Sequence, residues 1–188
     1  MMRVTGGSLR SRRVDAPRGR AVRPTPARVR EALFSILGAR IVGARVLDLF
    51  AGSGVVGFEA LSRGAASVTF VEAHRPTALA IERAAASLEV GERVEVIPLP
   101  AERAARILTG RYDLVFADPP YTSAFPAELF ARLRASGRID EGSVVVYEHS
   151  GRLPAPHSAE FAARRTERYG DVALTFLHPA PKELDGDG

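Results

Sequence analysis

The feature that most constrains the fold is a regular alternation of short apolar runs with helical segments between residues 45 and 148. Short runs rich in valine, leucine and phenylalanine are typical of strands that are buried on both faces of a sheet. The expected strands are residues 46–50, 67–72, 94–97, 113–117 and 143–148, and the expected helices between them are residues 57–62, 76–88, 101–108 and 126–133. Strands separated by one helix each form βαβ units, so the pattern predicts an α/β fold with a mostly parallel sheet and helices on both faces.

Both ends of the chain depart from this pattern. Residues 161–169 and 172–178 flank the turn residues Tyr169-Gly170-Asp171, which predicts a hairpin that closes one edge of the sheet antiparallel. Near the other end, Thr25 is expected to be the N-cap of a helix and Pro26 its first residue. Arg28 and Arg30 are expected to point away from the apolar stripe of that helix.

Positive charge is concentrated in the first 30 residues, which hold nine arginines and one aspartate. The whole chain carries a net charge of +4, so the rest of it is net acidic. A basic arm on an acidic body predicts contact with nucleic acid or another acidic surface. A solvated basic tail would have the same composition and is the simpler alternative.

The composition excludes several other classes of protein. There is no cysteine, which rules out disulfides and thiolate metal sites, and the four histidines lack ligand spacing, so we expect no metal. No run approaches the roughly 18 apolar residues of a membrane span, and the amino terminus lacks the apolar core of a secretory signal. These features favour a cytoplasmic protein, which we expect to be a monomer.

A glycine loop follows the first expected strand and predicts a ligand site. Gly52 to Gly57 reads as G-x-G-x-x-G, and Glu72 closes the next strand 20 residues after Gly52. The glycines let the backbone approach a ligand closely, and the acid can accept bonds from two ribose hydroxyls. Both features serve a dinucleotide as well as any other adenosyl cofactor.

Asp48 distinguishes between these cofactors. It lies just before the glycine loop, where a carboxylate would repel a pyrophosphate and attract a cation. A sulfonium cofactor without phosphates therefore fits better than a dinucleotide. In a third interpretation, Asp48 only caps the glycine turn.

A second motif, Asp118-Pro119-Pro120-Tyr121, follows the fourth expected strand. Two prolines stiffen the loop and leave it with free backbone carbonyls. Carboxylate, carbonyls and an aromatic face suit an amino group on a planar base. Since the carboxyl ends of parallel strands share one edge, cofactor and target amine are expected to meet there. A plain proline turn, with Tyr121 capping the core, is the alternative.

Several segments carry a resemblance to a known family: Val46–Gly54 (VLDLFAGSG), Glu59–Ala65 (EALSRGA), Val71-Glu72, the DPPY motif, Arg3–Gly7 (RVTGG) and Arg23–Phe34 (RPTPARVREALF). Together they resemble the bacterial small-subunit (16S) ribosomal RNA guanine-N2 methyltransferases of the RsmD type. The arm is the discriminating part, because many amino-methylating enzymes share the glycine loop and the proline motif.

The resemblance implies a class I, Rossmann-like methyltransferase fold, S-adenosyl-L-methionine as the donor, and a guanine amine in the small ribosomal subunit or its RNA as the acceptor. We expect residues 1–40 to form an RNA-binding arm and helix, residues 41–180 the methyltransferase domain, and residues 181–188 a frayed tail. One departure from the family concerns the adenine contact, where relatives often have Asp or Asn before an alanine and this chain has Pro100. Adenine is then expected to be held by backbone groups or by Glu102.

The expected site has three groups of residues. The catalytic residues are Asp118, Pro119 and Tyr121, with Asp118 and the Pro119 carbonyl accepting bonds from the amine and Tyr121 stacking on the base. The cofactor is expected to lie against Asp48, Phe50, Ala51, Gly52, Gly54, Glu72, Ala73, Ala101, Glu102 and Asp118. The RNA is expected to lie against Arg10, Arg12, Arg13, Arg20, Arg23, Thr25, Arg28, Arg30 and Tyr121.

Other interpretations stay open at this level. Glu148 ends the last parallel strand and could face the same crevice, although a solvated or arginine-paired carboxylate is the more common case. The same chemistry could act on adenine N6 or on a glutamine amide in protein, where relatives commonly carry Asn at the place of Asp118. An RNA-binding assembly factor without turnover is an alternative of another class.

Overall fold

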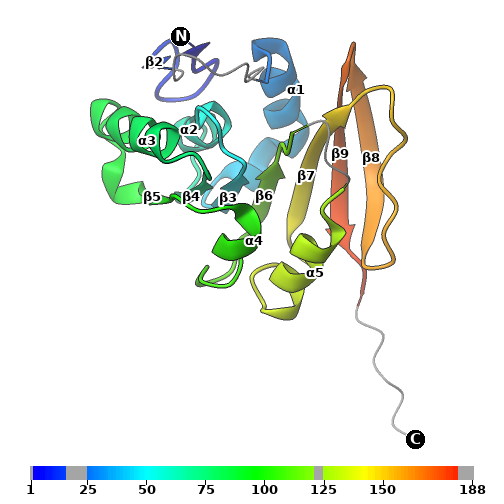
Figure 1. The fold of residues 1–188 in the computed structure, drawn as a ribbon. Helices are drawn as coiled ribbons and strands as arrows, with labels where there is room; N and C mark the ends of the chain where they lie inside the picture. Colours follow the sequence, from blue (N-terminus) through cyan, green and yellow to red (C-terminus); the bar gives the residue numbers. More distant parts are fainter. Residues whose placement is uncertain (1, 16–24, 121–124, 182–188) are drawn as a thin grey trace, which may run out of the picture.

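A computed structural model of the chain describes residues 2–15, 25–120 and 125–181. Its centre is a seven-stranded sheet in the order β5-β4-β3-β6-β7-β9-β8 (Figure 1). The strands are β3 (Arg45–Leu49), β4 (Ser67–Val71), β5 (Val94–Ile97), β6 (Leu114–Ala117), β7 (Val144–Ser150), β8 (Phe161–Tyr169) and β9 (Val172–Pro179). The first five strands in the sheet order are parallel, whereas β9 runs antiparallel to both β7 and β8. The expected α/β fold with an antiparallel carboxyl-terminal hairpin is confirmed.

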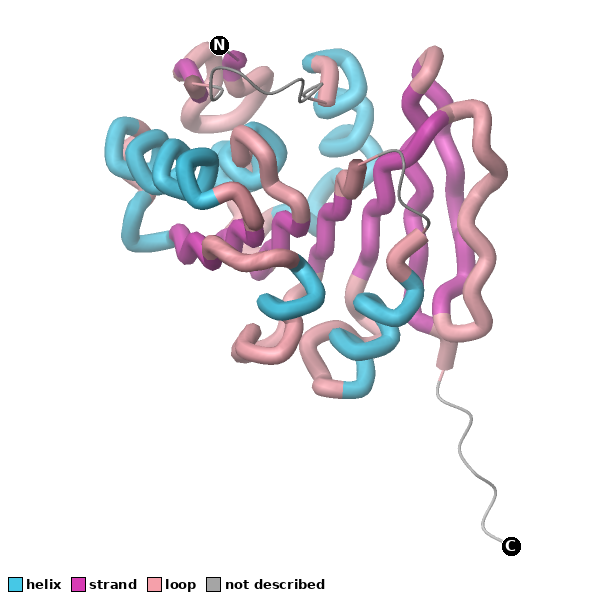
Figure 2. The backbone as a smooth tube through the Cα atoms, in the orientation of Figure 1, coloured by secondary structure: helices cyan, strands magenta, loops and turns pink. Residues whose placement is uncertain are grey.

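Helices cover both faces of this sheet (Figures 1 and 2). They are α1 (Ala27–Leu37), α2 (Val55–Ser62), α3 (Arg75–Ser87), α4 (Ala101–Ala104) and α5 (Ala127–Ala135), with 3-10 turns η1 (Gly38–Ile41) and η2 (Gly91–Arg93). Alternate residues of a strand point to opposite faces, so the sheet has two hydrophobic cores. Val46 and Phe70 pack with α1, α2 and α3, whereas Leu47 and Val71 pack with α4 and α5.

The amino-terminal arm folds back as a small hairpin of β1 (Met2–Arg3) and β2 (Arg13–Val14). Val4 and Val14 are buried in the same core as α1 and α2, so the described part of the arm is packed against the body. Gly7 makes this packing possible: its φ is +79°, and a Cβ there would lie 1.9 Å from the carbonyl oxygen of Ser62. A larger residue at position 7 would lift the hairpin off α2.

Two local expectations are wrong. Thr25 is not the N-cap of α1, because Pro26 occupies that position and its carbonyl accepts the bond from the Arg30 N–H at 3.0 Å. The Thr25 hydroxyl instead donates a hydrogen bond to the Glu148 carboxylate, which lies far along the sequence. The helix expected over 101–108 ends at Ala104, after which the chain turns and buries Leu108 in the core beneath α4 and α5.

Candidate active site

The site lies where the order of strands reverses. The chain runs from β3 outward to β4 and β5, then returns to place β6 on the other side of β3. Ligands of open α/β sheets bind at such a switch point, outside the carboxyl ends of the strands. Leu49 pairs with Ala117 across β3 and β6, so the glycine loop and the loop of Asp118 begin side by side. This is the adjacency that the two motifs predicted.

The glycine loop turns sharply through left-handed backbone. Phe50, Gly52 and Gly54 have φ values of 59°, 55° and 72°. The Ala51 N–H donates to the Val71 carbonyl at 3.0 Å, which ties the loop to the end of β4. Positive φ is costly for a residue with a side chain, and residues held in this way cluster at active sites. The conformation of Phe50 therefore adds a feature that residue types alone did not predict.

Asp48 is held beneath this loop. It is 1% exposed, and its Oδ2 accepts a hydrogen bond from the Gly57 N–H at 3.1 Å. Gly57 lies in the first turn of α2, where an added Cβ would sit 2.2 Å from the ring of Phe70. Asp48 thus anchors that turn, which is compatible with a capping role and with a contact to the cofactor. Burial raises the pKa of Asp48 well above its ordinary value, and the nearby charge of Glu72 raises it further.

Glu72 stands at the tip of β4 beside the loop. Its Oε2 accepts from the Gly52 N–H at 2.9 Å and its Oε1 from the His74 N–H at 2.8 Å. A carboxylate oxygen can accept more than one hydrogen bond, so two backbone donors orient the group without exhausting it. The carboxylate therefore lies beside the glycine loop at the edge of the sheet formed by the carboxyl ends of the parallel strands, which we call the rim.

The residues expected at the adenine end follow the neighbouring strands. Val71 pairs with Ile97, so the end of β5 adjoins that of β4. Ala73 is exposed just after β4, whereas Ala101 is buried at the start of α4. Glu102, next to it, is exposed. All of these lie along the rim that carries Glu72.

The opposite wall of the rim is formed by β6 and β7. Ala117 pairs with Tyr147, so the next residues of these strands, Asp118 and Glu148, stand across from each other. Glu148 is 1% exposed, and its Oε2 accepts a hydrogen bond from the Thr25 hydroxyl at 2.8 Å. We expected Glu148 to be either solvated or paired with an arginine. The first of these is wrong, because the carboxylate is buried. Glu148 lies inside β7, which continues to Ser150, so the expectation that it ends the strand is wrong by two residues.

The proline motif itself is only partly described. Pro119 is buried and Pro120 is exposed. Tyr121 lies outside the described residues.

The carboxyl groups of Asp48, Asp118 and Glu148 gather at this rim. Burial, together with the carboxylates of Glu148 and Asp48, raises the pKa of Asp118 to about 8. Like charges held close together in a poorly solvated place favour protonation or a bound cation. The arrangement thus suits a positively charged ligand between Asp48 and Asp118.

This pKa predicts a pH-dependent difference in stability between the wild type and Asp118→Asn. The unfolded chain loses the Asp118 proton near 3.8, whereas the folded protein keeps it until about 8. Between these values the wild type loses up to about 1.4 kcal/mol of unfolding free energy per pH unit, and the amide variant lacks this loss. Tyr147 nearby stays neutral in this range because burial raises its pKa too.

Urea unfolding of both proteins at several pH values between 4 and 8 measures the effect, and the variant should gain stability over the wild type as the pH rises. A constant difference over that range would mean that Asp118 titrates near its ordinary value.

The arginines expected to contact RNA fall into three groups. Arg10, Arg12 and Arg13 are exposed on the hairpin, and Arg28 is exposed on α1. Arg12 also donates from Nη2 to the Ser87 carbonyl at 2.7 Å, which fastens the hairpin to the end of α3. Arg20 and Arg23 lie outside the described residues.

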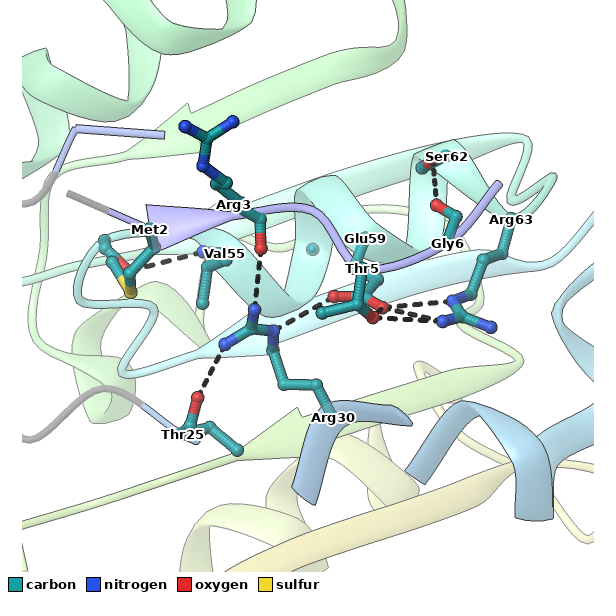
Figure 3. A network of polar contacts seen from close by, with 12 residues as sticks. Met2, Arg3, Thr5, Gly6, Thr25, Arg30, Val55, Glu59, Ser62 and Arg63 are labelled. Carbon is teal, nitrogen blue, oxygen red and sulfur yellow. Dashed lines mark hydrogen bonds and ion pairs between the residues drawn. The ribbon is translucent and has the colours of Figure 1, made fainter. Parts of the chain in front are cut away.

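Arg30 contradicts the expectation that it projects outward. It is 3% exposed, and its guanidinium donates to Glu59 Oε2 at 3.0 Å, to the Thr25 carbonyl at 2.7 Å and to the Arg3 carbonyl at 2.7 Å. Figure 3 shows the guanidinium between these three groups, which come from α2, the residue before the N-cap of α1, and the arm. Since its donors serve the interior, Arg30 is not carried forward as an RNA contact.

Comparison with known proteins agrees with this geometry. The chain matches the family described as "conserved hypothetical protein 95" over residues 2–178. It is 32% identical over 188 residues to ribosomal RNA small subunit methyltransferase D of Escherichia coli (strain K12), covering 99% of this chain and 94% of that protein. The chain belongs to the RsmD family.

Solved structures of relatives show the same architecture. The Escherichia coli protein yhhF superposes with a TM-score of 0.83 at 31% identity, covering 96% of this chain and 99% of that one. A hypothetical protein of Thermus thermophilus superposes with a TM-score of 0.77 at 32% identity, covering 95% of this chain and 99% of that one. Proteins of the RsmD family are class I methyltransferases that use S-adenosyl-L-methionine.

Two further findings concern other kinds of site. Within residues 2–15, 25–120 and 125–181, no group of three or more His, Cys, Asp or Glu side chains is arranged to hold a metal ion. In the same part of the chain, no helix is long and apolar enough to cross a membrane.

Proposed function

We propose that this protein transfers a methyl group from S-adenosyl-L-methionine to the exocyclic N2 amine of one guanine in small-subunit ribosomal RNA. The observation that carries the proposal is the meeting of the glycine loop and Asp118 at the switch point. The substrate is supported by membership of the family and by the name of the Escherichia coli relative. The acceptor is proposed to be the assembled or partly assembled small subunit, reached in the cytoplasm by a monomeric enzyme.

The carboxylates along the rim contact different parts of the cofactor. Asp48 faces the cationic methionine end, directly or through water, and Glu72 accepts bonds from the ribose hydroxyls. Backbone of the glycine loop at Phe50, Ala51, Gly52 and Gly54 lines the methionine portion. Ala73, Ala101 and Glu102 lie where the adenine would be held, by backbone groups or by Glu102.

Asp118 prepares the target amine for attack. The exocyclic nitrogen of guanine is a weak nucleophile, because its lone pair is delocalised into the ring. If Asp118 and the Pro119 carbonyl accept its two N–H bonds, the nitrogen becomes more pyramidal and its lone pair turns toward the sulfonium methyl. Transfer is in line, so that positioning supplies much of the acceleration. The positive charge of the bound cofactor favours the ionised form of Asp118. The nitrogen then sheds its proton to this carboxylate, and Tyr121 stacks on the extruded base with about 1–3 kcal/mol.

RNA binding is assigned to the amino-terminal part, residues 1–40, and catalysis to residues 41–180, with residues 181–188 as a tail. The exposed arginines Arg10, Arg12, Arg13 and Arg28 would contact phosphates, together with Arg20 and Arg23. Phosphate contacts position a nucleic acid without reading its sequence. The base itself is then read at the rim.

The proposal is tested by identifying the methylated product. Small subunits that lack the modification are incubated with the protein and labelled S-adenosylmethionine, and the RNA is digested to nucleosides. N2-methylguanosine at a single position is expected, at one methyl group per subunit. Label in N6-methyladenosine or in protein would overturn the guanine assignment, and cofactor binding without any transfer would identify an assembly factor. Naked ribosomal RNA, treated in parallel, shows whether the assembled subunit is needed.

A further inference from the structure

Glu148 is a buried carboxylate that the proposed transfer does not use. It lies on β7 directly across from Asp118, and its negative charge helps to raise the pKa of Asp118. It shares the sheet face of Val144 and Val146, which belong to the core that packs with α1. Its Oε2 accepts from the Thr25 hydroxyl at 2.8 Å, just before α1 begins. A buried ionisable group beside a reacting centre is a candidate for a functional role.

Thr25 is itself held by the arginine network. The Arg30 Nη1 donates to the Thr25 carbonyl at 2.7 Å, and the Arg30 Nε pairs with Glu59 at 3.0 Å (Figure 3). Glu59 is fully buried on α2, so the ion pair ties the segment of Thr25 to that helix. The Thr25 hydroxyl is therefore fixed with respect to the sheet, and it orients the Glu148 carboxylate from the side of α1.

The Watson–Crick edge of guanine presents two kinds of N–H group next to each other, the N2 amine and the N1–H. Adenine has an acceptor at N1. An ionised carboxylate only accepts hydrogen bonds, so it attracts the N1–H of guanine and repels the N1 lone pair of adenine. Neighbouring strands lie about 4.8 Å apart, which allows carboxylates on β6 and β7 to address adjacent groups on one base edge.

We propose that Glu148 accepts the N1–H of the target guanine and so determines specificity, with Thr25 as the residue that positions it. The inference rests on the proposed function, because it needs Asp118 to hold the N2 amine of the same base. Asp118 and Glu148 then accept hydrogen bonds from two neighbouring donors of the same guanine, the N2 amine and the N1–H. An adenine in this place would set its N1 lone pair against Glu148.

The test uses 2-aminopurine, which keeps the amine at C2 but has a lone pair in place of the N1–H. Once the methylated position is mapped, small subunits are reconstituted from ligated RNA with guanine or 2-aminopurine at that position. The wild type should methylate the guanine substrate about 10- to 100-fold faster in kcat/KM, the range expected for one hydrogen bond to a charged group. Glu148→Gln should reduce this preference to about threefold or less, because its amide can donate to the N1 lone pair.

Comparing the two proteins isolates the N1 contact, because the loss of the 6-oxygen affects both alike. Titration with S-adenosylmethionine checks that Glu148→Gln is folded and binds the cofactor. Thr25→Val, which lacks the hydroxyl, should also weaken the preference, whereas Thr25→Ser should restore it. A purely structural role of Thr25 would lower both rates without changing their ratio.

The inference is overturned if Glu148→Gln, with cofactor binding intact, keeps the wild-type preference and slows both substrates equally. That result would make Glu148 a structural group or a proton acceptor. Failure of the proposed function looks different, because the wild type would then form no N2-methylguanosine on unmodified subunits. If Glu148→Gln does not fold, the comparison of Thr25→Val with Thr25→Ser decides. Unequal preferences for guanine over 2-aminopurine in these two variants support the inference, and equal preferences refute it.

Discussion

Replacing Asp118 by alanine is expected to lower the rate of methyl transfer to ribosomal RNA by about a hundred- to a thousandfold. The side chain is the acceptor that holds the amine and takes its charge as the new bond forms, and loss of one such preorganised group costs about this much. The measurement is single-turnover transfer of labelled methyl to saturating unmodified subunits. Saturation matters, because it separates the chemical step from the binding of RNA.

Asp118→Asn is the matched variant for this experiment. It keeps one carbonyl acceptor at the same place and loses the charge, so its rate should fall between those of the wild type and the alanine variant. S-adenosylmethionine should still bind both variants, since Asp48 and Glu72 are unchanged, but more weakly, because the Asp118 carboxylate beside the cation is lost. Transfer by Asp118→Ala at close to the wild-type rate would show that Asp118 has been misassigned.

Replacing Arg30 by alanine is expected to destabilise the protein by about 3–5 kcal/mol, the range measured when one partner of a buried ion pair is removed. Glu59 has no exposed surface and loses its bond to Arg30, although Arg63 still pairs with its other oxygen at 2.8 Å. The carbonyls of Thr25 and Arg3 also lose their donors. Urea unfolding gives the difference in free energy directly.

Arg28→Ala is the control on the same helix. Arg28 is exposed, so its removal should leave the free energy of unfolding unchanged within error. It should instead weaken RNA binding and reduce the slope of log affinity against log salt by about 1, as expected for one lost phosphate contact. Equal losses of stability in the two variants would contradict the distinction between an internal and an external arginine.

Local sequence patterns were enough to predict the fold and the two loops that form the site. The apolar runs predicted the order of strands and helices, because burial on both faces of a parallel sheet requires continuous apolar sequence. The glycine loop and the proline motif were visible as short segments, and the rule for parallel sheets brought them to one rim. The seven-stranded sheet and the pairing of Leu49 with Ala117 agree with both expectations.

What the sequence by itself determined was therefore the alternation of strands and helices, the two loops at the carboxyl rim, and the acids Asp48, Glu72 and Asp118, each one residue from the end of a strand. Only the tertiary structure decided the roles of Arg30, Thr25 and Glu148. Arg30 pairs with a residue 29 positions away, and Thr25 bonds to one 123 positions away. The environment of a polar side chain depends on which distant segment covers it, and neither periodicity nor turn chemistry carries that information. Arginines of the same amino-terminal region thus divide into one that holds the interior together and others that remain exposed to solvent.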